Sequence, residues 1–391
     1  MEVETPAQHR APLPPQPCKD ATCTTHTQAG RGCISASTSR LLRNPVVVIN
    51  FVLIVFGSGA APLFLRAYFV HGGARKWLSA SLQTAGFPIL LVPLCVSFFS
   101  RRRKKASGDG DGAPFFFLMT PRLLAASVGI GLMAGVDDLL YAYGLAYLPV
   151  STSSILISTQ LAFTAAFALL LVRQRLTASS ANAVALLTAG AAMLGINAGG
   201  DRPAGVSRAQ YGAGFAMTLA AAALFGLMLP AMELSQARHA ARRGGGAVTY
   251  TLVVEMQLVI GLTATVFTVV GMLVNNDFHA IPGEAQDFGL GRSGYYLLLA
   301  GTAATYQCFF LGTIGSIFFG SALLAGVITT TLLPVTEVFA VVLFHEPFSG
   351  TKGVALALSL WGFVSYFYGE NQTSKANHQS ENPPDVEHLD P

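Results

Sequence analysis

The sequence predicts an all-α polytopic membrane protein, with ten transmembrane helices arranged as two inverted five-helix repeats. Of its 391 residues, 52% are hydrophobic and only 11% are charged, whereas about 25% of residues in a typical soluble domain are charged. Ten apolar stretches each approach the ~20 residues that a helix needs to cross a bilayer. Two hairpins, one in each half of the chain, also share one pattern of apolar and polar positions. A soluble protein of this composition would expose large apolar patches, so we expect a lipid bilayer around it.

Polar segments flank the ten apolar stretches. Residues 1–44 are rich in Pro, Thr, Ser and Gln and contain no early apolar run, so we expect a disordered cytoplasmic tail and no cleaved signal peptide. Residues 371–391 are expected to form a second disordered cytoplasmic tail. The predicted spans lie at about residues 45–66, 77–99, 123–146, 151–172, 181–199, 211–234, 248–274, 294–315, 320–343 and 352–369.

The distribution of lysine and arginine predicts the orientation of these spans. With a cytoplasmic N-terminus, seventeen of the 24 basic residues lie on the cytoplasmic side, which is the usual bias of membrane proteins. The densest run, RRRKK at residues 101–105, is interpreted as an anchor in a cytoplasmic loop, with a patch for lipid or nucleic acid as the alternative. Because the net charge is only +4, no nucleic-acid partner is expected. Both termini are therefore predicted to be cytoplasmic.

An internal repeat relates the two halves of the chain. SSILISTQLAFTAAFALLLVRQRLT at residues 153–177 aligns without gaps with AGVITTTLLPVTEVFAVVLFHEPFS at residues 325–349, and their apolar runs match. The first hairpin is predicted to end inside and the second outside, so residues 45–199 and 200–370 would form inverted repeats. This symmetry is typical of secondary transporters, whose binding site lies near the middle of the bilayer between the repeats.

Two adjacent carboxyl groups, those of Asp137 and Asp138, lie near the middle of the third predicted span. A carboxylate at this depth costs about 2.5 to 3.5 kcal/mol on insertion scales, so it normally faces a cavity or a partner. Adjacent helical residues diverge by about 100°, so we expect one side chain to line a path and the other to meet a neighbouring helix. Such a pair is suited to bind and release a proton; a structural hydrogen bond between helices is the alternative.

Three further polar side chains are candidates for contact with a ligand. Tyr141 follows Asp137 by one turn and shares its face, where it would stack on a flat ligand, donate a hydrogen bond or only pack. Gln160 and Gln307 lie in the fourth and eighth spans. Each amide offers two donors and an acceptor, which is the pattern that recognises the edge of a heterocycle. A hydrogen bond that holds two helices together is the alternative for each amide.

The other intramembrane carboxyl groups lie in the second half of the chain. Glu337 follows Pro334, which frees a carbonyl group one turn back and bends the ninth span, so Glu337 is a candidate to line the opening. Glu255 is a further candidate for proton coupling. It and Glu233 lie toward the cytoplasmic ends of their spans, where they would face each other or pair with Arg238. The five cysteines show no metal-binding spacing, so neither a zinc site, a disulfide framework nor any cofactor is expected.

Four long stretches of the chain are specific enough to compare with a known family. They are LPVSTSSILISTQLAFTAAFALLLV, VGMLVNNDFHAIPGEAQDF, LLPVTEVFAVVLFHEPF and KGVALALSLWGFVSYFYGE. These stretches resemble the plant purine permeases, a family of the drug/metabolite transporter superfamily. The resemblance covers about residues 45–370 and implies ten transmembrane helices and proton-coupled uptake of adenine, cytokinins and related heterocycles, with alkaloids or pyridoxine as the alternative substrates. The family has no short catalytic motif, so the candidate residues rest on the physical argument alone.

The function predicted is therefore import of a small purine together with protons, across what we expect to be the plasma membrane, and not an enzymatic reaction. No G-x-x-x-x-G-K-[ST] run is present to bind ATP. An intramembrane aspartyl protease would place its aspartates on two helices, whereas Asp137 and Asp138 are adjacent on one. A non-transporting receptor is disfavoured because inverted repeats supply the symmetry that alternating access requires.

Overall fold

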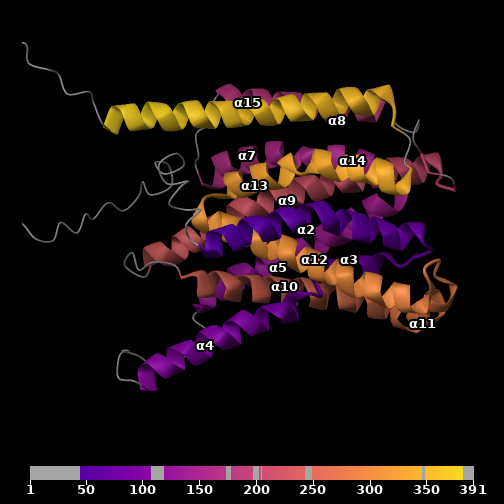
Figure 1. Ribbon diagram of the computed structural model, residues 1–391, viewed down its shortest axis with the longest axis horizontal. Helices are drawn as coiled ribbons and strands as arrows, with labels where there is room; N and C mark the ends of the chain where they lie inside the picture. The colour runs from indigo at the N-terminus through magenta and orange to yellow at the C-terminus, as the bar shows by residue number, and fades with distance from the viewer. Residues whose placement is uncertain are drawn as a thin grey trace, which may run out of the picture.

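The chain folds into a bundle whose regular elements, among the described residues, are all helices (Figure 1). Seven described helical segments are long and apolar enough to cross a membrane. The chain is therefore a helical membrane protein, and the number of ten crossings stays a prediction. The expected N-terminal tail lies outside the residues that the computed structural model describes, which are 45–106, 119–172, 178–196, 202–203, 205–242, 249–345 and 348–381.

The ten predicted spans each coincide with one helix or with a run of consecutive helices. In chain order the elements are α2 (Pro45–Val70), α3 (Lys76–Thr84), the 3-10 helix η1 (Phe87–Leu90), α4 (Leu91–Ala106), α5 (Pro121–Tyr147), α6 (Val150–Ser158), α7 (Gln160–Leu171), α8 (Ala178–Ile196), α9 (Arg208–Arg242), α10 (Tyr250–Val274), α11 (Asp277–Asp287), α12 (Gly291–Phe319), α13 (Ala322–Thr331), α14 (Leu333–Phe344) and α15 (Gly350–Glu381).

One boundary differs clearly from the prediction. A disordered tail is expected from residue 371, but this is wrong for residues 371–381, which continue α15 as far as Glu381. No proline interrupts the sequence between Gly350 and Glu381, so every residue of this stretch keeps the N–H group that a helix needs. The last helix is consequently longer than the apolar stretch that predicts it.

The fourth predicted span is divided into two half-helices. α6 ends at Ser158 and α7 begins at Gln160. The Ser158 hydroxyl donates to the carbonyl oxygen of Ile155 at 2.6 Å, and the Thr159 hydroxyl donates to that of Leu156 at 2.7 Å. Such bonds compete with the helical backbone ladder, and here they accompany an interruption of the helix that involves no proline.

The ninth predicted span is divided in the same way. α13 ends at Thr331 and α14 begins at Leu333. Pro334 cannot donate to the carbonyl group of Thr330, four residues earlier, and the bend expected at this proline takes the form of an interrupted helix. Thr159, between α6 and α7, aligns with Thr331, which immediately precedes Leu332 between α13 and α14. The two spans are therefore interrupted within one residue of matching positions.

Glycines bring the backbones of α2 and α12 into direct contact. These two helices pack extensively along their length. A Cβ atom at Gly57 of α2 would overlap the backbone of Phe309, and one at Gly312 of α12 would overlap the backbone of Ile54 and lie 2.8 Å from the carbonyl oxygen of Asn50. Because backbone atoms cannot move aside as a flexible side chain does, only glycine fits at these two positions.

Gly312→Ala should therefore destabilise the folded protein, by about 1 to 3 kcal/mol, as overpacking does elsewhere. We would measure the loss of the monodisperse gel-filtration peak after heating in detergent. Gly59→Ala is the matched control on α2, because a Cβ atom there would meet nothing within 4 Å. Equal thermal stability of the two variants would contradict the packing described for α2 and α12.

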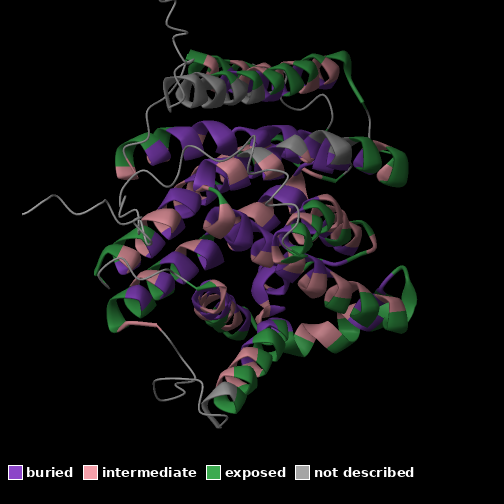
Figure 2. Cartoon of the chain, turned by 60° about the vertical axis from the view of Figure 1, so that its left-hand side comes forward, coloured by how far each residue is buried: buried purple, intermediate pink, exposed green. Residues whose placement is uncertain are grey.

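The outer surface of the bundle is apolar. Figure 2 shows buried residues gathered in the centre, while the outer helices expose much of their surface. α8 and α15 pack on one another and form a separate layer at one side of the bundle (Figure 1). Large apolar side chains such as Val52, Phe56, Val266 and Val270 are exposed. A surface of this kind fits lipid chains and would be unfavourable in water.

Glu284 of α11 joins three elements at one end of the bundle. It accepts hydrogen bonds from the phenol groups of Tyr68 in α2 and Tyr295 in α12, the latter at 3.2 Å. Arg75 Nε lies 3.8 Å from Glu284 Oε2, and Arg75 Nη1 lies 3.6 Å from Asp277 Oδ1. These contacts fix α11, which lies between the seventh and eighth predicted spans, against the ends of α2 and α12.

Candidate functional site

A central cavity lies where the two divided spans are interrupted. It encloses about 610 Å³ of space that no atom occupies, part of it continuous with solvent. Among the described side chains, each of the half-helices α6, α7, α13 and α14 contributes one lining residue, namely Ile157, Gln160, Thr329 and Leu333. The other lining residues come from α2, α3, α5, α9 and α12: Gly57, Ser58, Ala61, Pro62, Gln83, Asp137, Asp138, Tyr141, Ala221, Phe225, Tyr306, Phe309 and Phe310.

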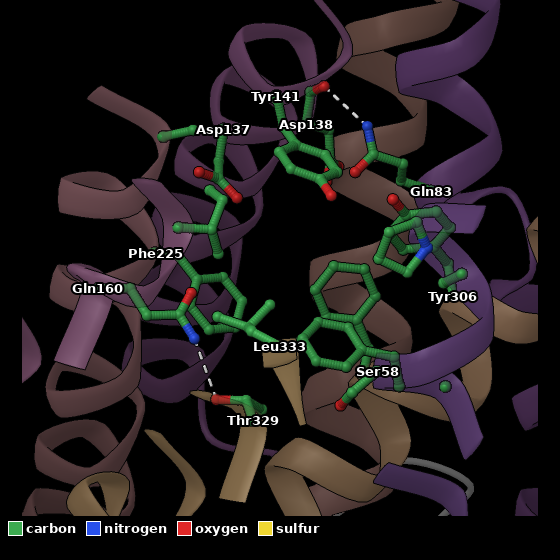
Figure 3. A pocket seen from close by; sticks show the side chains of 17 residues that line it. Ser58, Gln83, Asp137, Asp138, Tyr141, Gln160, Phe225, Tyr306, Thr329 and Leu333 are labelled. Carbon is green, nitrogen blue, oxygen red and sulfur yellow. Dashed lines mark hydrogen bonds between the residues drawn. The ribbon is translucent and has the colours of Figure 1, made fainter. Parts of the chain in front are cut away.

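Both adjacent aspartates line the central cavity (Figure 3). The expectation that only one of them would do so is wrong, because the cavity is wide enough to receive neighbouring residues of α5. Their exposed fractions are only 7% for Asp137 and 1% for Asp138. Among the described residues, neither carboxyl group has a hydrogen-bond or ion-pair partner, and Asp137 Oδ1 and Asp138 Oδ2 are fully buried. Within the described part of the chain, neither carboxyl group therefore forms the hydrogen bond between helices that was the alternative explanation for its position.

Aromatic side chains from three helices form one wall of the cavity. The rings of Phe225 in α9 and Phe309 in α12 are stacked, with centroids 5.8 Å apart and planes inclined by 25°. Phe310 and Tyr306 extend this wall, with ring centroids 6.4 Å apart, and Tyr141 of α5 lines the cavity beside them. Flat π-systems stack favourably on such a surface, so the cavity is suited to a planar ligand.

Gln160 lies at the beginning of α7 and faces the central cavity (Figure 3). Its Nε2 donates to Thr329 Oγ1 of α13 at 3.0 Å. One N–H and the carbonyl oxygen of the amide remain, because a glutamine amide has two donors and an acceptor. The side chain therefore links two half-helices and still presents a donor and an acceptor to a ligand.

Pro62 changes the backbone of α2 where that helix borders the cavity. Since proline has no N–H group, the carbonyl oxygen of Ser58, four residues earlier, loses its helical donor. Thr336 Oγ1 of α14 lies 3.4 Å from that oxygen and donates to it. Ser58 and Pro62 both line the cavity, so an irregular segment of α2 meets the interrupted ninth span there.

Gln83 of α3 is a lining residue that sequence reasoning missed. Its Nε2 donates to the backbone carbonyl oxygen of Asp138 at 2.7 Å, while its amide oxygen is turned toward the cavity (Figure 3). The signal that was available is an amide within an apolar span, the same signal that singles out Gln160. Gln83 adds a second amide to the site and holds α3 against α5 beside the two carboxyl groups.

Two predicted site residues, Gln307 and Glu255, are not among the described residues that line the central cavity. Gln307 is buried, and its Cβ atom lies close to Gly86, just before η1, although its neighbour Tyr306 does line the cavity. Glu255 is buried in the second turn of α10. Glu337 belongs to α14, but its side chain is outside the described part of the structure.

The expected salt link from Glu233 to Arg238 is also replaced by another contact. Glu233 Oε2 accepts a hydrogen bond from the backbone N–H of Ala322 at 2.9 Å. Ala322 is the first residue of α13, where the N–H groups have no helical partner. A carboxylate is favourable at such a helix start, so Glu233 of α9 anchors one of the half-helices that form the cavity.

Comparison with known proteins gives consistent matches over nearly all of the described chain. A family model described as purine nucleobase transmembrane transport matches residues 45–376. The Arabidopsis thaliana protein named Purine permease 3 is 46% identical over 325 residues, which cover 83% of this chain and 90% of that protein. Purine permease 2 from the same plant is 46% identical over 340 residues, covering 84% and 93%. Probable purine permease 5 is 35% identical over 336 residues, covering 84% and 89%.

Proposed function

Because the chain belongs to the plant purine permease family, we propose that it is a proton-coupled secondary transporter that imports purine nucleobases and their derivatives, including adenine and cytokinins. The observation that carries this proposal is the central cavity, which combines an aromatic wall, two amides and two buried carboxyl groups without partners among the described residues. The family consists of transporters, and no enzymatic reaction is proposed.

The chemistry of the cavity favours a flat, nitrogen-rich heterocycle. A purine ring would stack against Phe225 and Phe309, and its edge would offer alternating donors and acceptors to Gln160 and Gln83. Asp137 and Asp138 are the proposed proton-coupling residues, and Tyr141 is a proposed contact of the substrate. Glu255 and Glu337 remain secondary proposals, because the first does not line the cavity and the second has no described side chain.

The proposed transport cycle rests on ten spans in two inverted repeats, residues 45–199 and 200–370. Two observations support this arrangement. The fourth and ninth spans are interrupted within one residue of matching positions, and Ile157 and Thr329, which align in the two hairpins, both line the cavity. Rocking of one repeat against the other would then open the cavity to each side in turn.

Uptake of radiolabelled adenine by yeast cells that express the protein is the direct test of the proposed function. We expect saturable uptake that depends on a proton gradient, and competition by cytokinins. Stronger competition by alkaloids or pyridoxine would assign the cavity to other nitrogen heterocycles. Saturable binding without flux would contradict transport and indicate a receptor.

The proposed orientation places both termini in the cytoplasm, with the protein in the plasma membrane. Asn371, Gln372 and Thr373 form an N-x-T acceptor sequence for glycosylation. In this orientation Asn371 lies on the cytoplasmic side, where it should not be modified. We expect no glycosidase-sensitive mass shift of the wild-type protein. Phe278→Thr is the control, because it creates an acceptor at the exposed Asn276 in the proposed outer loop and should add a glycan. A shift that disappears in Asn371→Gln would reverse the orientation.

A further inference from the structure

A second cavity, which we call the basic cavity, lies between the beginning of α5 and the end of α9. It encloses about 1020 Å³ of space that no atom occupies, part of it continuous with solvent. Arg122 is separated from Asp137 by about 22 Å along α5, at 1.5 Å per residue, so the basic cavity is distinct from the central one. Its lining residues are Thr120, Pro121, Arg122, Leu123, Ala126, Ser235, Arg238, His239 and Arg242.

The described residues of the lining carry several basic groups and no carboxylate. Arg238 and Arg242 lie one turn apart on the same face of α9, and Arg122 faces them from the first turn of α5. Within the described part of the chain, none of the three guanidinium groups forms an ion pair. All three arginines are exposed, so water weakens the repulsion among their charges, and their combined charge attracts an anion to the cavity.

Two further polar side chains, those of Thr120 and His239, line the basic cavity. His239 is buried, with 7% exposure, and its Nδ1 lies 3.2 Å from Thr120 Oγ1. Thr120 caps α5, where the positive end of the helix dipole favours an anion. These arginines could serve only to set the orientation of the spans in the membrane, for which basic residues in a cytoplasmic loop are enough. That role does not require three arginines and a histidine from two helices to surround one cavity.

We propose that the basic cavity is a binding site for a phosphoryl group. Guanidinium groups bind phosphate oxygens through paired N–H groups, with a geometry that lysine cannot match. The site lies at the end of the bundle that we assign to the cytoplasm, where basic pockets between transmembrane helices receive lipid headgroups. The phosphoryl group would come either from an anionic phospholipid or from a soluble phosphate ester. This proposal does not depend on which substrate the central cavity carries.

Binding to the purified full-length protein tests the proposal. Phosphatidic acid in phosphatidylcholine vesicles is the lipid probe, and inorganic phosphate and AMP are the soluble probes. We expect at least one probe to bind, and the Arg238→Gln, Arg242→Gln double variant to bind it at least about tenfold more weakly, because two charge-assisted hydrogen-bonding groups are lost. Binding of phosphatidic acid alone would assign the site to a lipid headgroup, and binding of the soluble probes would assign it to a free phosphate ester.

Arg208→Gln is the matched control, because Arg208 is an exposed arginine at the opposite end of the same helix. It should leave binding unchanged. If the double variant does not give a monodisperse gel-filtration peak, Arg122→Gln on α5 provides the same test from the other helix. The proposal is overturned if no probe binds, if the variants bind as tightly as wild type, or if Arg208→Gln weakens binding equally. Adenine uptake is measured in a separate experiment. A lack of uptake would contradict the proposed transport function, but it would not contradict phosphoryl binding in the basic cavity.

Discussion

Asp137→Asn is expected to abolish proton-driven accumulation of adenine while leaving adenine exchange across the membrane partly intact. Accumulation needs a source of free energy, and a membrane potential supplies about 2.3 kcal/mol per elementary charge for each 100 mV. One proton carried with each neutral purine would therefore support substantial accumulation. Exchange of external for internal adenine needs no net proton movement, so it does not require the carboxyl group.

The structure gives this expectation its physical basis. Asp137 lines the central cavity on the same face of α5 as Tyr141, and its carboxyl group has no partner among the described residues. Asp138 also lines the cavity, but its backbone is held by Gln83 and its side chain is less exposed. We therefore expect Asp138→Asn to reduce accumulation less than Asp137→Asn does.

Accumulation and counterflow would be measured in the same yeast cells, with surface expression determined for each variant. Asparagine preserves the size of the side chain, so a loss confined to accumulation identifies proton coupling and not misfolding. Wild-type accumulation by Asp137→Asn across a proton gradient would refute its role. Asp138, the other carboxyl group in the cavity, would then be the first candidate, followed by Glu255 and Glu337.

The sequence predicted the positions of the helices well, because a span must hold about 20 apolar residues and such stretches are visible without any structure. The break at Pro334 was also predictable, since proline lacks the N–H group that a helix requires. The break at Thr159 was not, because it depends on hydroxyl groups that turn back to the carbonyl groups of Ile155 and Leu156. A cluster of serine and threonine residues in the sequence does not show whether their hydroxyl groups will bond to the backbone in this way.

The direction in which each side chain points was much less predictable. Spans that are apolar on every side give no periodic signal to mark the inward face. Gln307 and Tyr306 are adjacent, yet Tyr306 lines the cavity and Gln307 lies near Gly86. Gln83 carries the same signal as Gln160, an amide within an apolar span, but this signal does not show that the side chain meets the cavity. Polar residues within the spans thus identify candidates for the binding site. Only the packing of the helices determines which of these side chains line the same cavity.

Gln160→Ala is expected to raise the KM for adenine by about fivefold to 150-fold. This corresponds to the roughly 1 to 3 kcal/mol of discrimination that an amide provides when it forms two hydrogen bonds with adenine. Gln307→Ala is the matched control, since it removes the same amide from a buried position that does not line the central cavity. It should leave the KM unchanged at equal surface expression. A larger effect of Gln307→Ala than of Gln160→Ala would contradict the site described here.

Thr329→Val separates a contact with the ligand from a contact between helices. Gln160 Nε2 donates to Thr329 Oγ1, so an amide that served only to join α7 to α13 would lose the same hydrogen bond in either variant. Gln160→Ala and Thr329→Val would then change the KM equally. If the remaining N–H and carbonyl oxygen of Gln160 contact the purine, Gln160→Ala removes them and Thr329→Val does not. We therefore expect Thr329→Val to raise the KM less than Gln160→Ala does, and equal effects would show that this amide only links the half-helices.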